Sequence, residues 1–137
     1  MQVVKAHGAR IPLIGLGTWD LRGRVCARMV EQALRLGYRH IDTAEMYDNE
    51  REVGKGLRAA GVKRNEVFVT TKIWPSHFAP RELERAAKDS LARLRLSEVD
   101  LLAIDELGKG RGSPFEMETL DELIGRASCR ERVFGYV

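Results

Sequence analysis

Short apolar segments alternate with longer amphipathic segments along the chain. Apolar residues at 3–4 and 11–14 flank a polar stretch that contains Gly8, a pattern that favours a β-hairpin. The later apolar runs are short and rich in β-branched residues, as buried strands are. These further strands are predicted around Gly15 and at residues 38–42, 67–71 and 99–104.

Three segments between these strands have the three- and four-residue apolar spacing of amphipathic helices. They lie at 25–36, at 49–60 and from Pro80 onward, where proline suits the first helical position. Gly37 and Gly61 follow the first two helices and are expected to end them. The predicted apolar faces consist of Val25, Met29, Val30, Ala33 and Leu34 in the first helix, Val53, Leu57 and Ala60 in the second, and Leu83, Ala87, Leu91 and Leu94 in the third.

This alternation predicts an α/β fold with a parallel sheet and helical crossovers. Ligands of such sheets bind at the carboxyl ends of the strands. Asp42, Lys72 and Asp105 each fall at the end of a predicted strand, and Thr18 and Trp19 follow the first strand of the series. We therefore expect the functional site at this edge of the sheet.

Composition and charge narrow the class of protein. The 137 residues are 44% hydrophobic and 31% charged, which is ordinary for a globular domain. No apolar run approaches the roughly 20 residues of a membrane span. The first residues lack the apolar core of a signal peptide, so we expect a cytoplasmic protein. The net charge of +3 forms no run of like charges, which argues against nucleic-acid binding.

The two cysteines, Cys26 and Cys129, have neither the spacing of metal ligands nor that of a disulfide framework. Cys26 falls within the first predicted helix, where a small buried core residue is the expected role. The sequence therefore predicts no metal site.

Asp42, Tyr47 and Lys72 are the residues with the clearest chemical potential. An ammonium beside a phenol favours the ionised phenol, and Asp42 could hold Lys72 in place by an ion pair. A tyrosine in such surroundings could donate a proton to a developing alkoxide. This is the acid–base half of a carbonyl reduction, and the hydride half requires a nicotinamide cofactor. Taken singly, each residue could instead be a cap, a rim aromatic or a solvated charge.

The stretch GYRHIDTAEMYDNEREVG at 37–54 resembles the signature of the aldo-keto reductases, cytosolic TIM-barrel enzymes that use NADPH. IPLIGLGTWD at 11–20 and VFVTTKIW at 67–74 also resemble this family, and the resemblance covers roughly residues 3–104. The YDNE and TTKIW segments lean toward the prokaryotic branch that includes the 2,5-diketogluconate reductases. The resemblance implies a (β/α)8 barrel fold. It also implies a monomeric enzyme that reduces aldehydes or ketones.

By position, the resemblance makes Tyr47 the proton donor, Lys72 the residue that favours its ionisation, and Asp42 the support of the lysine. It also implies a set of cofactor contacts and a set of substrate contacts. For Trp74, packing at the rim is an equally good interpretation. The implied cofactor-binding residues are Gly17, Thr18, Trp19 and Asp42, and the implied substrate-binding residues are Trp19, Tyr47 and Trp74.

The family pattern breaks after residue 104. Asp105 stands where the family has a histidine, and Glu106 and Leu107 replace a Trp-Pro pair. The histidine donates a hydrogen bond to the substrate carbonyl, whereas an ionised aspartate would repel a developing oxyanion. A sequence error is as good an explanation as a real substitution, and neither His40 nor His77 replaces the missing histidine.

Residues 1–123 are expected to form the N-terminal half of the barrel. A complete barrel takes roughly 250 residues, so only about four of its β/α units are expected here. Residues 124–137 are expected to be non-native, because IGRASCRERV resembles the translation of a sequencing adapter. The parent protein would then be the enzyme, and these 137 residues alone are expected not to turn over substrate.

Two alternatives remain open on the sequence alone. One is a non-catalytic NADP-binding module of the same fold, which the Asp105 substitution mildly favours. The other is an isomerase that uses Asp42 as a base without a cofactor.

Overall fold

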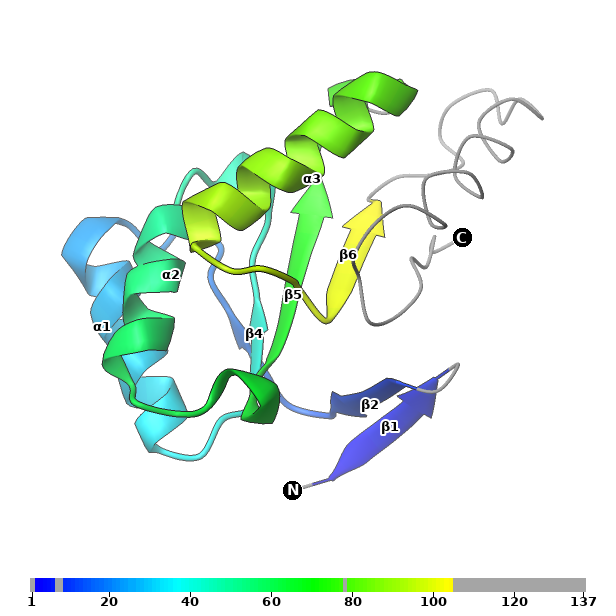
Figure 1. Cartoon of the computed structure of the whole chain (residues 1–137). Helices are drawn as coiled ribbons and strands as arrows, with labels where there is room; N and C mark the ends of the chain where they lie inside the picture. Colours follow the sequence, from blue (N-terminus) through cyan, green and yellow to red (C-terminus); the bar gives the residue numbers. More distant parts are fainter. Residues whose placement is uncertain (1, 7–8, 78, 105–137) are drawn as a thin grey trace.

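The computed structural model describes residues 2–6, 9–77 and 79–104 of the chain (Figure 1). It begins with the expected hairpin, in which β1 (Val3–Ala6) pairs antiparallel with β2 (Ala9–Pro12). The second strand starts earlier than predicted and ends at Pro12. Leu13 and Ile14, which were expected within this strand, lie beyond its end, so that part of the prediction was wrong. The hairpin lies beside the amino-terminal ends of the other strands (Figure 1).

A parallel sheet follows, with the strand order β3-β4-β5-β6. Its strands are β3 (Leu16–Gly17), β4 (His40–Asp42), β5 (Phe68–Ile73) and β6 (Leu101–Ile104). Spatial order equals chain order, as in an arc of a (β/α)8 barrel. The predicted strands are thus confirmed, with shifted ends: β5 continues to Ile73, so Lys72 lies within the strand rather than just after it.

Three helices cover one face of this sheet (Figure 1). They are α1 (Gly23–Arg35), α2 (Glu50–Ala59) and α3 (Pro80–Leu94). The third helix begins at Pro80, as predicted. Gly37 and Gly61 have positive φ angles of 102° and 69° where the first two helices end, which agrees with their expected role. The core between helices and sheet includes Val30, Ile41, Val53, Val69, Ile73, Leu94 and Leu102.

The predicted apolar face of α1 was partly wrong. Val25 and Met29 are 61% and 41% exposed, whereas Cys26 and Val30 are fully buried. Each exposed residue precedes a buried one by one position, which turns it about 100° around the helix axis. The orientation of α1 is set by its packing on α2, where a Cβ on Gly56 would collide with the Ala27 carbonyl and the Val30 side chain.

Cys26 is buried, as expected, and burial raises the pKa of its thiol to about 11. The thiol therefore stays protonated and acts as a small core group. Within the described ranges, no helix is long and apolar enough to cross a membrane, and no three His, Cys, Asp or Glu side chains gather as a metal site would require.

Candidate active site

The carboxyl ends of the parallel strands bring the predicted site residues to one edge of the sheet. Asp42 ends β4, and Lys72 is the next-to-last residue of the neighbouring strand β5. The chain leaves β4 through a 3₁₀ turn, η1 (Glu45–Tyr47), which presents Tyr47 to the same edge. Asp48 follows this turn in the left-handed conformation, so the chain reverses there and enters α2.

The Lys72 ammonium is the centre of this group. It donates a hydrogen bond to the Asp42 carboxylate and another to the Thr43 carbonyl oxygen at 3.3 Å. The phenolic oxygen of Tyr47 lies 3.4 Å from the same Nζ atom. The side chains of Lys72 and Asp42 are 20% and 40% exposed, so the ion pair is shielded on the protein side and open on the other. The predicted ion pair is therefore present, next to the predicted phenol.

Thr18 fixes the loop after β3 against the end of β4. Its amide N–H and its hydroxyl both donate to the carbonyl oxygen of Asp42, at 2.9 and 3.2 Å. The buried Asn49 side chain holds the loop from the other side, because its Nδ2 donates to the Thr18 carbonyl at 2.8 Å and to the Leu21 carbonyl at 3.0 Å. Thr43 in turn donates to the Asn49 side-chain oxygen at 3.2 Å.

Sequence reasoning missed this role of Asn49. The residue precedes α2, where asparagine usually caps a helix, but its side chain makes no capping hydrogen bond here. Its partners are 28 and 31 positions away in the chain, so local pattern gave no signal for them.

Trp19 and Tyr47 form the open rim of the group. Their rings pack edge to face, with centroids 5.0 Å apart and an interplanar angle of 66°. Trp19 is 60% exposed, and a Cβ added at Gly17 would meet nothing within 4 Å. Arg22 donates to the backbone carbonyl of Tyr47 at 3.0 Å and thereby ties η1 to the start of α1.

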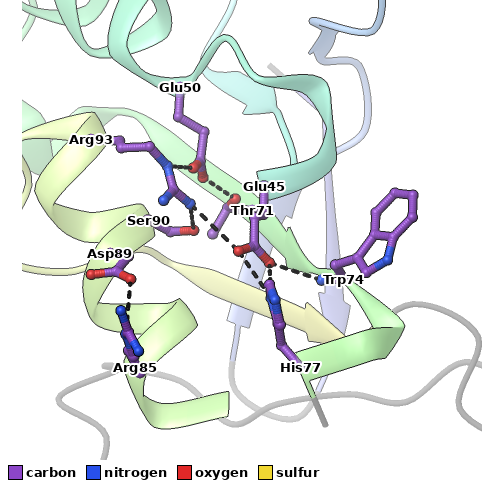
Figure 2. A network of polar contacts seen from close by, with 9 residues as sticks. All are labelled: Glu45, Glu50, Thr71, Trp74, His77, Arg85, Asp89, Ser90 and Arg93. Carbon is purple, nitrogen blue, oxygen red and sulfur yellow. Dashed lines mark hydrogen bonds and ion pairs between the residues drawn. The ribbon is translucent and has the colours of Figure 1, made fainter. Parts of the chain in front are cut away.

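Trp74 follows β5 and is 41% exposed. Its backbone N–H donates to the Glu45 carboxylate at 3.1 Å, which links it to the turn that carries Tyr47. The Trp74 indole itself points away from that carboxylate (Figure 2). Asp105 lies outside the described residues.

Comparison with known proteins agrees with this fold. A profile of the Aldo/keto reductase family matches residues 13–124. The chain is 47% identical over 94 residues to a methylglyoxal reductase DkgB of Salmonella typhi, covering 69% of this chain and 35% of that protein. It is 50% identical over 95 residues to a glycerol 2-dehydrogenase (NADP(+)) of Saccharomyces cerevisiae, covering 69% of this chain and 30% of that protein.

Among solved structures, one described as a 2,5-diketo-D-gluconic acid reductase B superposes with a TM-score of 0.88 at 35% identity. It covers 98% of this chain and 48% of that one. The expected branch of the family is confirmed by this structure and by the Salmonella relative. The chain spans about a third of the length of the curated relatives. Because the family profile matches most of its residues, the chain belongs to the aldo/keto reductase family.

Proposed function

We propose that this sequence belongs to an NADPH-dependent oxidoreductase that reduces aldehydes or ketones to alcohols. The observation that carries the proposal is the position of the Lys72 ammonium, which touches the Asp42 carboxylate and lies 3.4 Å from the Tyr47 hydroxyl. The names of two relatives also support the proposal, because one is a methylglyoxal reductase and the other is a glycerol 2-dehydrogenase (NADP(+)).

In this proposal Tyr47 donates the proton that the substrate oxygen needs when the carbonyl becomes an alcohol. Lys72 favours release of that proton, since a positive charge beside the phenol stabilises the phenolate. Asp42 accepts a hydrogen bond from the ammonium and keeps it directed at the site. The Lys72 side chain would have to break its ion pair with Asp42 before it could move away from the phenol.

The residues around Gly17 suit a bound nicotinamide cofactor. The space beside Gly17 is open, and the loop through Thr18 is held in place by hydrogen bonds with the Asp42 carbonyl and with Asn49. Gly17, Thr18, Trp19 and Asp42 would hold the cofactor, which supplies the hydride when it is bound. Trp19, Tyr47 and Trp74 would contact the carbonyl substrate from the exposed rim.

A hybrid reductase tests this proposal. In it, residues 1–104 replace the equivalent segment of a full-length family member. We expect it to bind NADPH and to consume NADPH when methylglyoxal is added. A hybrid that folds and binds NADPH without consuming it would favour the non-catalytic NADP-binding module instead. Product formation without any nicotinamide cofactor would favour a cofactor-free isomerase.

A further inference from the structure

Figure 2 shows a network of polar contacts around Glu45, Glu50 and Arg93, whose charged side chains have no role in the proposed chemistry. At its centre is Glu45, the first residue of η1, whose side chain is only 15% exposed. Tyr47 ends the same turn. Glu45 therefore lies in the same three-residue turn as the proposed proton donor.

The Glu45 carboxylate binds the segment that follows β5 at two points. It accepts a hydrogen bond from the Trp74 backbone N–H at 3.1 Å, and Nδ1 of His77 lies 3.1 Å from it. His77 ends the short 3₁₀ turn η3 (Pro75–His77), so both ends of this segment are attached to one carboxylate. We call this set of contacts the Glu45 clamp.

Arg93, which lies near the Glu45 carboxylate, is itself held by the buried side chain of Glu50. Glu50, which is 1% exposed, accepts a hydrogen bond from the Thr71 hydroxyl at 2.6 Å and another from Nε of Arg93 at 2.7 Å. Arg93 also donates to the Ser90 hydroxyl, and its Nη2 lies 3.9 Å from the Glu45 carboxylate. The Arg93 guanidinium on α3 thus lies near the Glu45 carboxylate, which Trp74 and His77 contact from the segment after β5.

These contacts join two chain segments that lie just beyond the carboxyl ends of the paired strands β4 and β5. One presents Tyr47 and the other presents Trp74, which is 27 positions further along the chain. A carbonyl substrate that touches both side chains would need their separation to be constant. Without the clamp, the segment after β5 would lose both hydrogen-bonded attachments to Glu45 and would depend on the β4–β5 pairing before it.

We propose that Glu45 is a positioning residue for substrate binding. Its carboxylate fixes the Trp74 segment against the turn that carries Tyr47, so that both side chains meet one bound carbonyl compound in a set geometry. This inference rests on the proposed reductase function for its kinetic consequence. Its structural part, the restraint of Trp74 by Glu45, stands independently of that function.

The restraint is measured by tryptophan fluorescence in the 137-residue chain, which contains two tryptophans. In a Trp19→Phe background Trp74 is the sole tryptophan. We expect Glu45→Ala to raise acrylamide quenching of Trp74 roughly twofold, because its segment loses both attachments. Glu45→Gln keeps one acceptor oxygen, so its quenching of Trp74 should lie between that of the background and that of Glu45→Ala. The matched control is Glu52→Ala, which removes a carboxylate paired with Lys55 on α2 and should leave quenching unchanged.

His77→Ala covers the case in which Glu45→Ala does not fold. The His77 side chain is 42% exposed, so its removal should leave the fold intact. The change removes one of the two contacts with Glu45 and should also raise the acrylamide quenching of Trp74. Quenching that stays at the background value in folded Glu45→Ala, or in His77→Ala if the former is unfolded, would overturn the proposal.

The kinetic consequence is measured in the hybrid reductase with methylglyoxal. Glu45→Ala should raise KM about tenfold and leave kcat within about twofold, a split that simple loss of folded protein would not give. Glu52→Ala should change neither constant. Equal KM values for Glu45→Ala and the parent hybrid would contradict the positioning role. A parent hybrid that folds and binds NADPH but does not consume it would refute the proposed function, and the quenching result would still decide whether the clamp restrains Trp74.

Discussion

The Nζ atom of Lys72 lies 3.4 Å from the phenolic oxygen of Tyr47, although the two residues are 25 positions apart in the chain. The contact arises because β5 lies beside β4 and the turn after β4 folds back over the strand ends. The same ammonium binds Asp42, the last residue of β4. The sheet register therefore sets the distance between the proposed proton donor and its charged neighbour.

Replacing Lys72 by methionine should remove most of the turnover of the hybrid reductase. The phenol loses the positive charge that favours proton release, and a positioned acid–base group contributes roughly 10²–10⁴-fold to a rate. The measurement is kcat for methylglyoxal at saturating NADPH. The matched control is Lys55→Met, because the Lys55 side chain is 64% exposed and pairs with Glu52 on the surface. A Lys72→Met variant with kcat within twofold of the parent would show that the ammonium is not needed.

Replacing Arg93 by methionine should destabilise the fold. Glu50 is 1% exposed, and its carboxylate would lose its charged partner while remaining buried. Removing one member of a buried pair costs roughly 3 kcal/mol of unfolding free energy. Urea unfolding followed by circular dichroism measures the loss.

Arg85→Met is the control for this prediction, since it lies on the same helix and its pair with Asp89 is exposed (Figure 2). Surface pairs of this kind contribute at most about 1 kcal/mol, so the control should unfold close to the parent. An equal loss of unfolding free energy in both variants would mean that the buried Arg93–Glu50 pair stabilises the fold no more than the exposed Arg85–Asp89 pair does.

His40 should make stability depend on pH. Burial lowers the pKa of His40 from its usual value of 6.5, against opposing contributions from the Pro12 carbonyl and from Asp42. The unfolded chain therefore takes up a proton at a higher pH than the native protein does. Stability should be fully present above about pH 6.5 and should fall as the pH drops through the lowered native pKa.

The His40 prediction is checked by urea unfolding at about pH 7.5 and about pH 5.5. The parent chain should lose more stability between the two than His40→Gln does, because glutamine takes up no proton. The comparison between the two proteins isolates His40 from carboxylates that titrate nearby. An equal loss in both proteins would place the pH dependence elsewhere.

Local pattern was enough to predict the order of strands and helices and the edge where Asp42 and Lys72 meet. Strand ends of a parallel sheet share one edge whatever the details of packing, so this prediction needed only the alternation of elements. The positive φ angles at Gly37 and Gly61 followed in the same way from a helix that must stop.

Contacts between distant segments were beyond local pattern. Glu50 and Arg93 are 43 positions apart, and nothing in the spacing of charges pairs one with the other. The buried face of α1 was misjudged for a related reason. It depends on how closely α2 approaches at Gly56, which is a property of the packed helices and not of the α1 sequence.

The most direct test of the account is the turnover of Tyr47→Phe in the hybrid reductase. This change removes only the hydroxyl that lies beside Lys72, and Tyr38→Phe removes a hydroxyl from a residue before β4 as the matched control. We predict that kcat for methylglyoxal falls by roughly 10²-fold or more in Tyr47→Phe, with NADPH affinity retained, and that Tyr38→Phe keeps the parent rate. An unchanged kcat in Tyr47→Phe would contradict the assignment of Tyr47 as the proton donor.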